Sequence, residues 1–240
     1  MNLHWPFPNL KLGFTVSELA RDFSQTSNSL AVAPAGCGKT HLIADAVSQC
    51  RGRQLVLTHT HAGVRALLDH MRKRGLTPDQ YRIATIDGFA LRYAGAFPSI
   101  SDWTDTHPQD SALWKQLRIS AVKPLKRNSI RQVVRCSYSG VFVDEYQDCT
   151  TGQHRLISAI AEILPCRILG DPLQSVFWKI NDGDHVAWSE VESQFAKTFD
   201  LSIPYRWQGQ NQELGEWLLD VRSKLIEGEP IDLDNAPVVR

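Results

Sequence analysis

The sequence predicts an α/β fold, in which a parallel sheet carries helices on both faces in three layers and a small subdomain is inserted. Short aliphatic runs alternate with longer segments of helical character, which is typical of repeated βαβ units. With 240 residues and 42% hydrophobic content, the chain is also long enough to bury a substantial core. Several prolines fall between the predicted elements, where they break no hydrogen-bonded ladder: Pro78, Pro98, Pro108, Pro165 and Pro204.

Six short apolar runs, each bounded by polar or turn-forming residues, are expected to form the strands. They are residues 30–33, 55–58, 82–85, 141–143, 167–169 and 198–201. Four longer segments are expected to form helices, namely residues 40–50, 62–74, 151–163 and 210–226. The alternation is regular up to residue 95 and resumes at residue 141.

Residues 96–140 interrupt this alternation, and we interpret them as a basic inserted subdomain between the two parts of the main domain, 1–95 and 141–240. Residues 111–143 contain no acid, but they contain seven bases. A solvated helix face is the usual explanation of such a run, and contact with nucleic acid is the alternative. The seven bases are Lys115, Arg118, Lys123, Lys126, Arg127, Arg131 and Arg135.

Composition excludes several classes of protein. No run approaches the ~18 apolar residues of a membrane helix, and the first ten residues lack the layout of a signal peptide, so we expect a cytoplasmic protein with no membrane partner. The five cysteines are scattered without a C-x-x-C pair, which argues against a disulfide framework and a zinc site. The net charge is zero, so the whole-molecule field gives no general attraction to nucleic acid.

Residues 31–40, AVAPAGCGKT, join a predicted strand to the start of a predicted helix through a loop of small residues. Such a loop lets backbone N–H groups close around phosphates at the positive end of the helix. Lys39 is expected to reach the β- and γ-phosphates, and the Thr40 hydroxyl to bind Mg²⁺. The predicted nucleotide-binding residues are Ala35, Gly36, Cys37, Gly38, Lys39 and Thr40.

Cys37 lies inside this loop. A helix N-terminus lowers the pKa of a thiol, so we expect a lowered pKa at this position. A small side chain that fills the place of a serine is the favoured interpretation, and a redox switch is the alternative.

Residues 140–148, GVFVDEYQD, form an apolar strand that ends in acids. At the sheet edge Asp144 can hold Mg²⁺ through water, and Glu145 can orient and deprotonate an attacking water. Alone, such acids are often only a polar loop. Because they follow the phosphate loop by about a hundred residues, they predict an ATPase that uses ATP and Mg²⁺.

The acidic motif resembles the D-E-x-Q-D motif of the UvrD/Rep branch of superfamily 1 DNA helicases, and residues 33–40 are similar to that family's A-x-A-G-x-G-K-T form. The resemblance extends over residues 18–234. It implies the first RecA-like domain, which binds ATP, of a P-loop NTPase. It also implies that the chain stops before the second motor domain, so that single-stranded DNA and a second RecA-like domain or partner protein are the expected partners.

Four further motifs carry the resemblance. Residues 57–62 and 84–90 look like motifs that touch single-stranded DNA, 169–177 resemble the G-D-x-x-Q-S motif, and 201–206 are similar to the N-Y-R motif. By this resemblance Gln174 senses the γ-phosphate and Arg206 reaches it, so the catalytic set is Lys39, Asp144, Glu145, Gln174 and Arg206. The residues expected to contact DNA are Thr58, His59, Thr60, Phe89, Phe177 and Trp178.

Two departures from the family pattern bear on specificity. Pro204 replaces the asparagine of the N-Y-R motif, and Glu18 stands where the family has a glutamine that reads adenine. Triphosphate binding is therefore predicted more firmly than the choice of adenine. His59 and His61, two residues apart, could suggest a metal pair, but no further ligand cluster accompanies them.

Two functions fit these motifs. The first is an ATP-dependent helicase or translocase. The second is a nucleotide-dependent DNA-sensing or scaffold ATPase subunit, for example of a defence complex, that does not unwind DNA.

Overall fold

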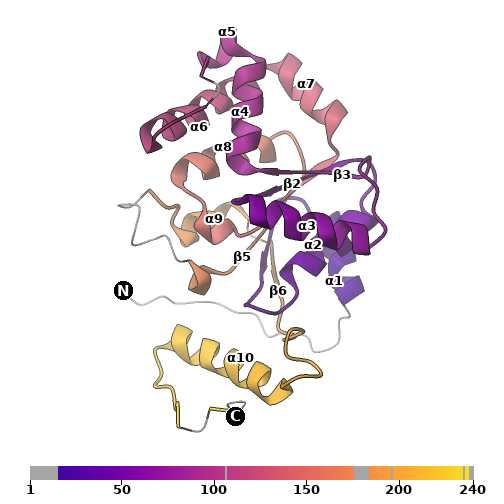
Figure 1. The fold of residues 1–240 in the computed structure, drawn as a ribbon, viewed down its shortest axis with the longest axis vertical. Helices are drawn as coiled ribbons and strands as arrows, with labels where there is room; N and C mark the ends of the chain where they lie inside the picture. The colour runs from indigo at the N-terminus through magenta and orange to yellow at the C-terminus, as the bar shows by residue number, and fades with distance from the viewer. Residues whose placement is uncertain (1–15, 106, 176–183, 196, 235, 238–240) are drawn as a thin grey trace.

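A computed structural model describes residues 16–105, 107–175, 184–195, 197–234 and 236–237. Its centre is a six-stranded sheet in the order β3-β2-β4-β5-β1-β6, with every neighbouring pair parallel (Figure 1). All six strands lie where the sequence predicts them. They are β1 Ser29–Val32, β2 Gln54–Thr58, β3 Tyr81–Thr85, β4 Gly140–Val143, β5 Cys166–Gly170 and β6 Lys197–Asp200.

The four predicted helices are confirmed as α2 (Lys39–Gln49), α3 (His61–Lys73), α8 (Thr151–Ala161) and α10 (Gln212–Glu227). Further helices had no sequence-based prediction. They are α1 Val16–Gln25, α4 Ile86–Ala96, α5 Pro98–Ser101, α6 Ser111–Leu125, α7 Asn128–Ser137 and α9 Trp188–Gln194, and the short 3-10 turns are η1 Tyr146–Asp148 and η2 Pro172–Gln174.

Alternation along the strands divides the core into two layers, because successive side chains of a strand point to opposite faces of the sheet. Leu55 and Leu57 of β2 join a core cluster with α4, α6 and α8, whereas Val56 between them joins a second cluster with α1, α2 and α3. In β4, Phe142 lies on the second face and its neighbours on the first. The sheet is thus covered on both sides, as the sequence predicts.

Threonine caps start three of the helices that follow strands. The hydroxyl of Thr60 accepts from the Gly63 N–H at 3.0 Å at the start of α3, and Thr85 caps α4 in the same way. Thr150 begins α8 with a capping box completed by Gln153. Each cap satisfies an N–H group that the first helical turn leaves without a partner. The caps of Thr60 and Thr85 fix where the chain turns at the carboxyl ends of β2 and β3, and the Thr150 cap fixes the start of α8 after η1.

The segment 96–140 supplies α5, α6 and α7, which lie at one end of the molecule, with α10 at the other end (Figure 1). Leu117 and Ala121 of α6 are fully buried in the core cluster that includes α4 and α8. Several of its bases are engaged within the fold: Arg118 pairs with Asp87 at 2.7 Å and Arg131 with Glu162 at 3.2 Å. The interpretation of 96–140 as a separate subdomain remains a proposal.

Helix α10 is packed near the carboxyl edge of the sheet. A side chain at Gly215 would meet Trp207 and Pro204 within 3.1 Å, and Leu219 packs on the second core cluster. Across the described ranges, no helix combines the length and apolarity that crossing a membrane requires.

Candidate functional site

The loop after β1 bends around two glycines with left-handed backbone. Gly36 has φ of 78° and Gly38 has φ of 85°, a conformation that favours glycine. A Cβ on Gly36 would lie 2.9 Å from Cβ of Arg206, and one on Gly38 would lie 3.0 Å from the Tyr205 ring. The loop then enters α2 at Lys39, with the Leu42 N–H donating to Gly38 O at 2.9 Å. This is the strand–loop–helix geometry of a phosphate-binding loop.

Lys39 and Glu145 form an ion pair across the site, with Nζ 2.6 Å from Oε2. The same oxygen accepts from Nε2 of Gln147 at 2.8 Å. Burial by itself would raise the pKa of Glu145, but the Lys39 charge and the hydrogen bonds from Gln147 and Lys39 lower it overall. Glu145 is therefore ionised and able to accept a proton, as a general base must be.

The backbone at Glu145 has φ of 55°, which is left-handed and uncommon for a residue with a side chain. It directly follows β4 and precedes η1, so the strain falls at the point where the acidic motif leaves the sheet. Such outliers persist where surrounding contacts hold them in place. Here the contacts are those that Glu145 makes with Lys39 and Gln147.

Asp144 lies at the carboxyl end of β4 and is 6% exposed. Its Oδ1 accepts from the Glu145 N–H at 3.0 Å. Burial and the neighbouring Glu145 charge raise the pKa of Asp144 to about 7. A divalent cation would favour the ionised form, and hard cations prefer the carboxylate and hydroxyl oxygens that Asp144 and Thr40 offer. The residues therefore fit Mg²⁺.

Cys37 requires a correction. Its side chain is 1% exposed within the second core cluster, and burial raises the pKa of the thiol to about 11, although Arg222, Arg206 and Lys39 act in the opposite direction. The predicted lowering of the pKa is wrong, because loss of hydration outweighs the loop's position at the start of a helix. Cys37 is a buried small side chain.

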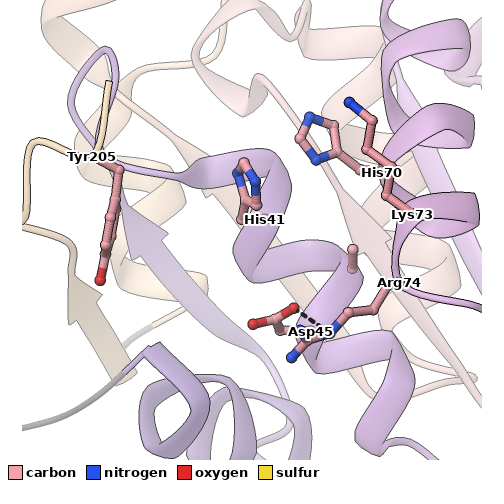
Figure 2. A pocket seen from close by; sticks show the side chains of 7 residues that line it. His41, Asp45, His70, Lys73, Arg74 and Tyr205 are labelled. Atoms are coloured by element: carbon pink, nitrogen blue, oxygen red, sulfur yellow. Dashed lines mark ion pairs between the residues drawn. The ribbon is translucent and has the colours of Figure 1, made fainter. Parts of the chain in front are cut away.

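The segment with Tyr205 and Arg206 lies against the phosphate loop. The Arg206 N–H donates to Gly36 O at 3.0 Å, which holds this exposed arginine beside the loop. Tyr205 also faces a cavity of about 490 Å³ that includes His41, His70 and Lys73 (Figure 2). His41 belongs to the first turn of α2, two residues after Lys39, so the cavity adjoins the phosphate loop.

Gln174 is placed in η2, after the end of β5. Its amide donates to Oδ2 of Asp171, a carboxylate that also binds Arg222 of α10. Asp171, Gln147 and Arg222 are site residues that were not predicted from the sequence. Asp171 and Gln147 belong to recognised motifs, which offered a signal, whereas Arg222 lies in a helix with no motif.

The residues predicted to contact DNA are only partly exposed. Thr60 is exposed and caps α3, and His59 is half-buried with Nε2 3.6 Å from Sγ of Cys149. Burial lowers the pKa of His59 to about 4, so this ring is neutral at physiological pH. Thr58 is 2% exposed, at the end of β2.

Phe89 requires a second correction. It is 3% exposed in the first core cluster and stacks on Tyr93 with ring centroids 4.3 Å apart. A ring that packs inward cannot stack on a base, so the predicted contact of Phe89 with DNA does not fit the structure. Phe177 and Trp178, predicted for the same role, lie outside the described residues.

In the part of the chain that the structure describes, no group of three or more His, Cys, Asp and Glu side chains is arranged as a metal-binding cluster. His61 is exposed at the first position of α3, two residues from the half-buried His59.

The parallel sheet, the phosphate loop after β1 and the acidic pair after β4 define a RecA-like P-loop domain of the superfamily 1 helicase type. The chain belongs to the AAA domain family, whose model matches residues 17–178.

A structural comparison supports the fold. The crystal structure of Pif1 helicase from Candida albicans superimposes with a TM-score of 0.51 at 17% sequence identity, covering 93% of this chain and 46% of that chain. The chain therefore spans less than half the length of that helicase. No curated protein sequence matches it.

Proposed function

We propose that this chain is the ATP-binding half of a DNA helicase or translocase of the UvrD/Rep type, which hydrolyses ATP on single-stranded DNA. The observation that carries the proposal is the Lys39–Glu145 pair. It brings the lysine of the phosphate loop and the acid of the following motif into one site, as hydrolysis of a nucleoside triphosphate requires.

In this mechanism the Lys39 ammonium moves from Glu145 to the β- and γ-phosphates, because the phosphates carry more negative charge than the carboxylate does. Glu145 is then free to orient the attacking water and to take its proton. Thr40 and Asp144 would hold Mg²⁺, which supplies positive charge that neutralises the phosphates. Arg206, beside Gly36, would stabilise the charge that develops on the γ-phosphoryl group.

The cavity at Tyr205 and His41 supports a place for the nucleoside. It adjoins the phosphate loop, and the Tyr205 ring can stack on a base of any identity. The choice of ATP over other triphosphates rests on the family resemblance. The cofactors we propose are ATP and Mg²⁺.

Single-stranded DNA is the proposed partner. Three exposed bases of the α6–α7 region, Lys126, Arg127 and Arg135, offer charge for contact with phosphates. The second proposed partner is another RecA-like domain that completes the ATP cleft.

The test of the proposal is hydrolysis of ATP by the chain with and without single-stranded DNA. We expect slow hydrolysis that DNA stimulates and that fails in Lys39→Ala. Binding of ATP and DNA with no hydrolysis under any condition would instead favour the sensing or scaffold function.

A further inference from the structure

We propose that Arg222 of α10 is a positioning residue of the nucleotide site, which acts through Asp171 and Gln147 on the carboxylate of Glu145. The inference rests on the proposed function, since it assigns Arg222 to the hydrolysis of the triphosphate. It concerns a residue 16 positions beyond Arg206, the last site residue that the motifs predict.

The first contact of this network joins Arg222 of α10 to Asp171, which follows the end of β5. Nη1 of Arg222 lies 2.6 Å from Oδ1 and 2.7 Å from Oδ2 of Asp171. Asp171 is 1% exposed, and the Arg222 side chain is 15% exposed. A charge buried to this degree needs a paired and hydrogen-bonded partner, so Arg222 fixes the Asp171 carboxylate.

The second contact joins Asp171 to the acidic motif. The Asp171 N–H donates to Oε1 of Gln147 at 3.0 Å, and Nε2 of the same amide donates to Oε2 of Glu145 at 2.8 Å. An amide that accepts at one end and donates at the other is held in a single orientation. Arg222 therefore connects to the proposed general base through Asp171, whose carboxylate it binds and whose backbone N–H bonds to Gln147, and then through the Gln147 amide.

A branch of the same network reaches η2. Oδ2 of Asp171 also accepts from Nε2 of Gln174, and Oδ1 accepts from the Leu173 N–H at 3.1 Å. With Arg222 these bonds engage both carboxylate oxygens of Asp171. The loop that carries Gln174 is thus shaped by the residue that Arg222 holds.

The Arg222 charge also acts on two other groups near the site. Burial raises the pKa of Asp200 at the end of β6, and the Arg222 charge opposes that rise. At Cys37 of the phosphate loop, burial raises the pKa of the thiol, and the Arg222 charge lowers that pKa more than any other nearby charge does. The guanidinium therefore lies where the ends of β5 and β6 meet the phosphate loop.

The first experiment compares single-turnover ATP hydrolysis by the full chain with Arg222 changed to Gln and to Lys. If Arg222 positions Glu145, R222Q should lower the hydrolysis rate about tenfold while the ATP affinity changes less than threefold, because a small misplacement of a catalytic group is costly in rate. R222K should recover part of the rate. Lys224→Gln, which removes a partly exposed cation on the same helix that pairs with Asp220 one turn earlier, serves as the matched control and should leave the rate unchanged.

A double-mutant cycle separates positioning from general loss of stability. If the effect passes through Gln147, R222Q should slow hydrolysis much less in a Gln147→Ala background than in the wild type. Purely additive losses would overturn the inference, as would an unchanged rate in R222Q. To exclude misfolding, D171N/R222Q removes both charges together, and it should fold and remain as slow as R222Q.

A second measurement does not depend on turnover. Hydrogen exchange of the Leu173 and Gln174 amides should accelerate in R222Q but not in K224Q, because both amides bond to Asp171. Unchanged exchange would overturn the inference even if the wild type hydrolyses ATP. If the wild type hydrolyses no ATP, the proposed function fails, and accelerated exchange in R222Q would still support the connection between α10 and η2.

Discussion

In the structure the ammonium of Lys39 lies 2.6 Å from Oε2 of Glu145, so the cation of the phosphate loop pairs with the acid that follows β4, across the intervening strand β5. The Lys39 side chain is 10% exposed, so water screens this attraction only in part. A triphosphate would compete with Glu145 for the lysine. In the proposed mechanism nucleotide binding and activation of the base are therefore linked, because the lysine that would bind the nucleotide is the one that would release Glu145.

The first prediction concerns Glu145. Glu145→Gln should retain ATP binding and lose hydrolysis by about 10²–10⁴-fold, because an amide of the same shape cannot take a proton from water. Binding is measured by calorimetry and hydrolysis by single turnover. Near-normal turnover in this variant would remove Glu145 from the role of base.

The second prediction concerns Lys39. Lys39→Ala should weaken ATP binding by about ten- to a hundredfold, which corresponds to a lost hydrogen bond to a charged group. Calorimetry measures the affinity. The control is Lys126→Ala, which removes an exposed lysine at the carboxyl end of α6 and should leave the ATP affinity unchanged. Equal affinities in wild type and Lys39→Ala would contradict the phosphate-loop assignment.

The third prediction concerns the pH dependence of stability. Burial raises the pKa of Asp144 from its usual value near 4 to about 7, so between these values the folded chain holds a proton that the unfolded chain releases. The contribution of this group to stability is complete below about pH 4 and is lost as the pH rises through about 7.

Without Mg²⁺ and nucleotide, the wild type should therefore lose stability relative to Asp144→Asn between pH 5 and pH 8, by on the order of 1–3 kcal/mol. Denaturant unfolding at several pH values measures the difference. A constant difference across this range would show that Asp144 does not titrate there.

The fourth prediction concerns the basic surface of the α6–α7 region. Neutralising Lys126, Arg127 and Arg135 together should weaken binding of single-stranded DNA of any sequence and reduce the log–log salt slope by about 0.7 for each lost phosphate contact. The control neutralises three exposed arginines elsewhere, Arg21, Arg51 and Arg72. If both triple variants bind alike, the basic run is only a solvated face.

Much of the fold could be predicted from the sequence because the strands are short, apolar and separated by clear turns. The helices α4 and α6 were not predicted, because their residue types do not follow their burial. In α6 the apolar Ile119 is 50% exposed and the polar Ser120 is 3% exposed, and in α4 small residues stand at the exposed positions Gly88, Gly95 and Ala96. Periodicity identifies a helix best when polar residues mark its exposed face.

The site was predictable in part for a similar reason. Lys39, Asp144 and Glu145 stand in motifs whose spacing is set by strand ends. By contrast, Arg222 reaches Asp171 only because α10 folds back over the sheet edge, and Phe89 is buried because α4 packs against the sheet and against α6 and α8 in the first core cluster. Tertiary contacts of this kind leave no local signal in the sequence.

The fifth prediction concerns unwinding. The chain alone should not separate a tailed duplex in the presence of ATP, because stepping along a strand requires two domains that close on ATP and alternate their grip. A strand-displacement assay measures this directly. ATP-dependent unwinding by the purified chain, free of any partner, would contradict its role as one half of a motor.

The central claim is that this chain binds and hydrolyses ATP in response to single-stranded DNA. Its most direct test is the rate of phosphate release by the purified chain with Mg²⁺ and ATP, measured with and without single-stranded DNA for the wild type and Lys39→Ala. We predict a slow rate that DNA increases in the wild type and that is lost in the variant. A rate that DNA does not change, or that Lys39→Ala retains, would contradict the claim.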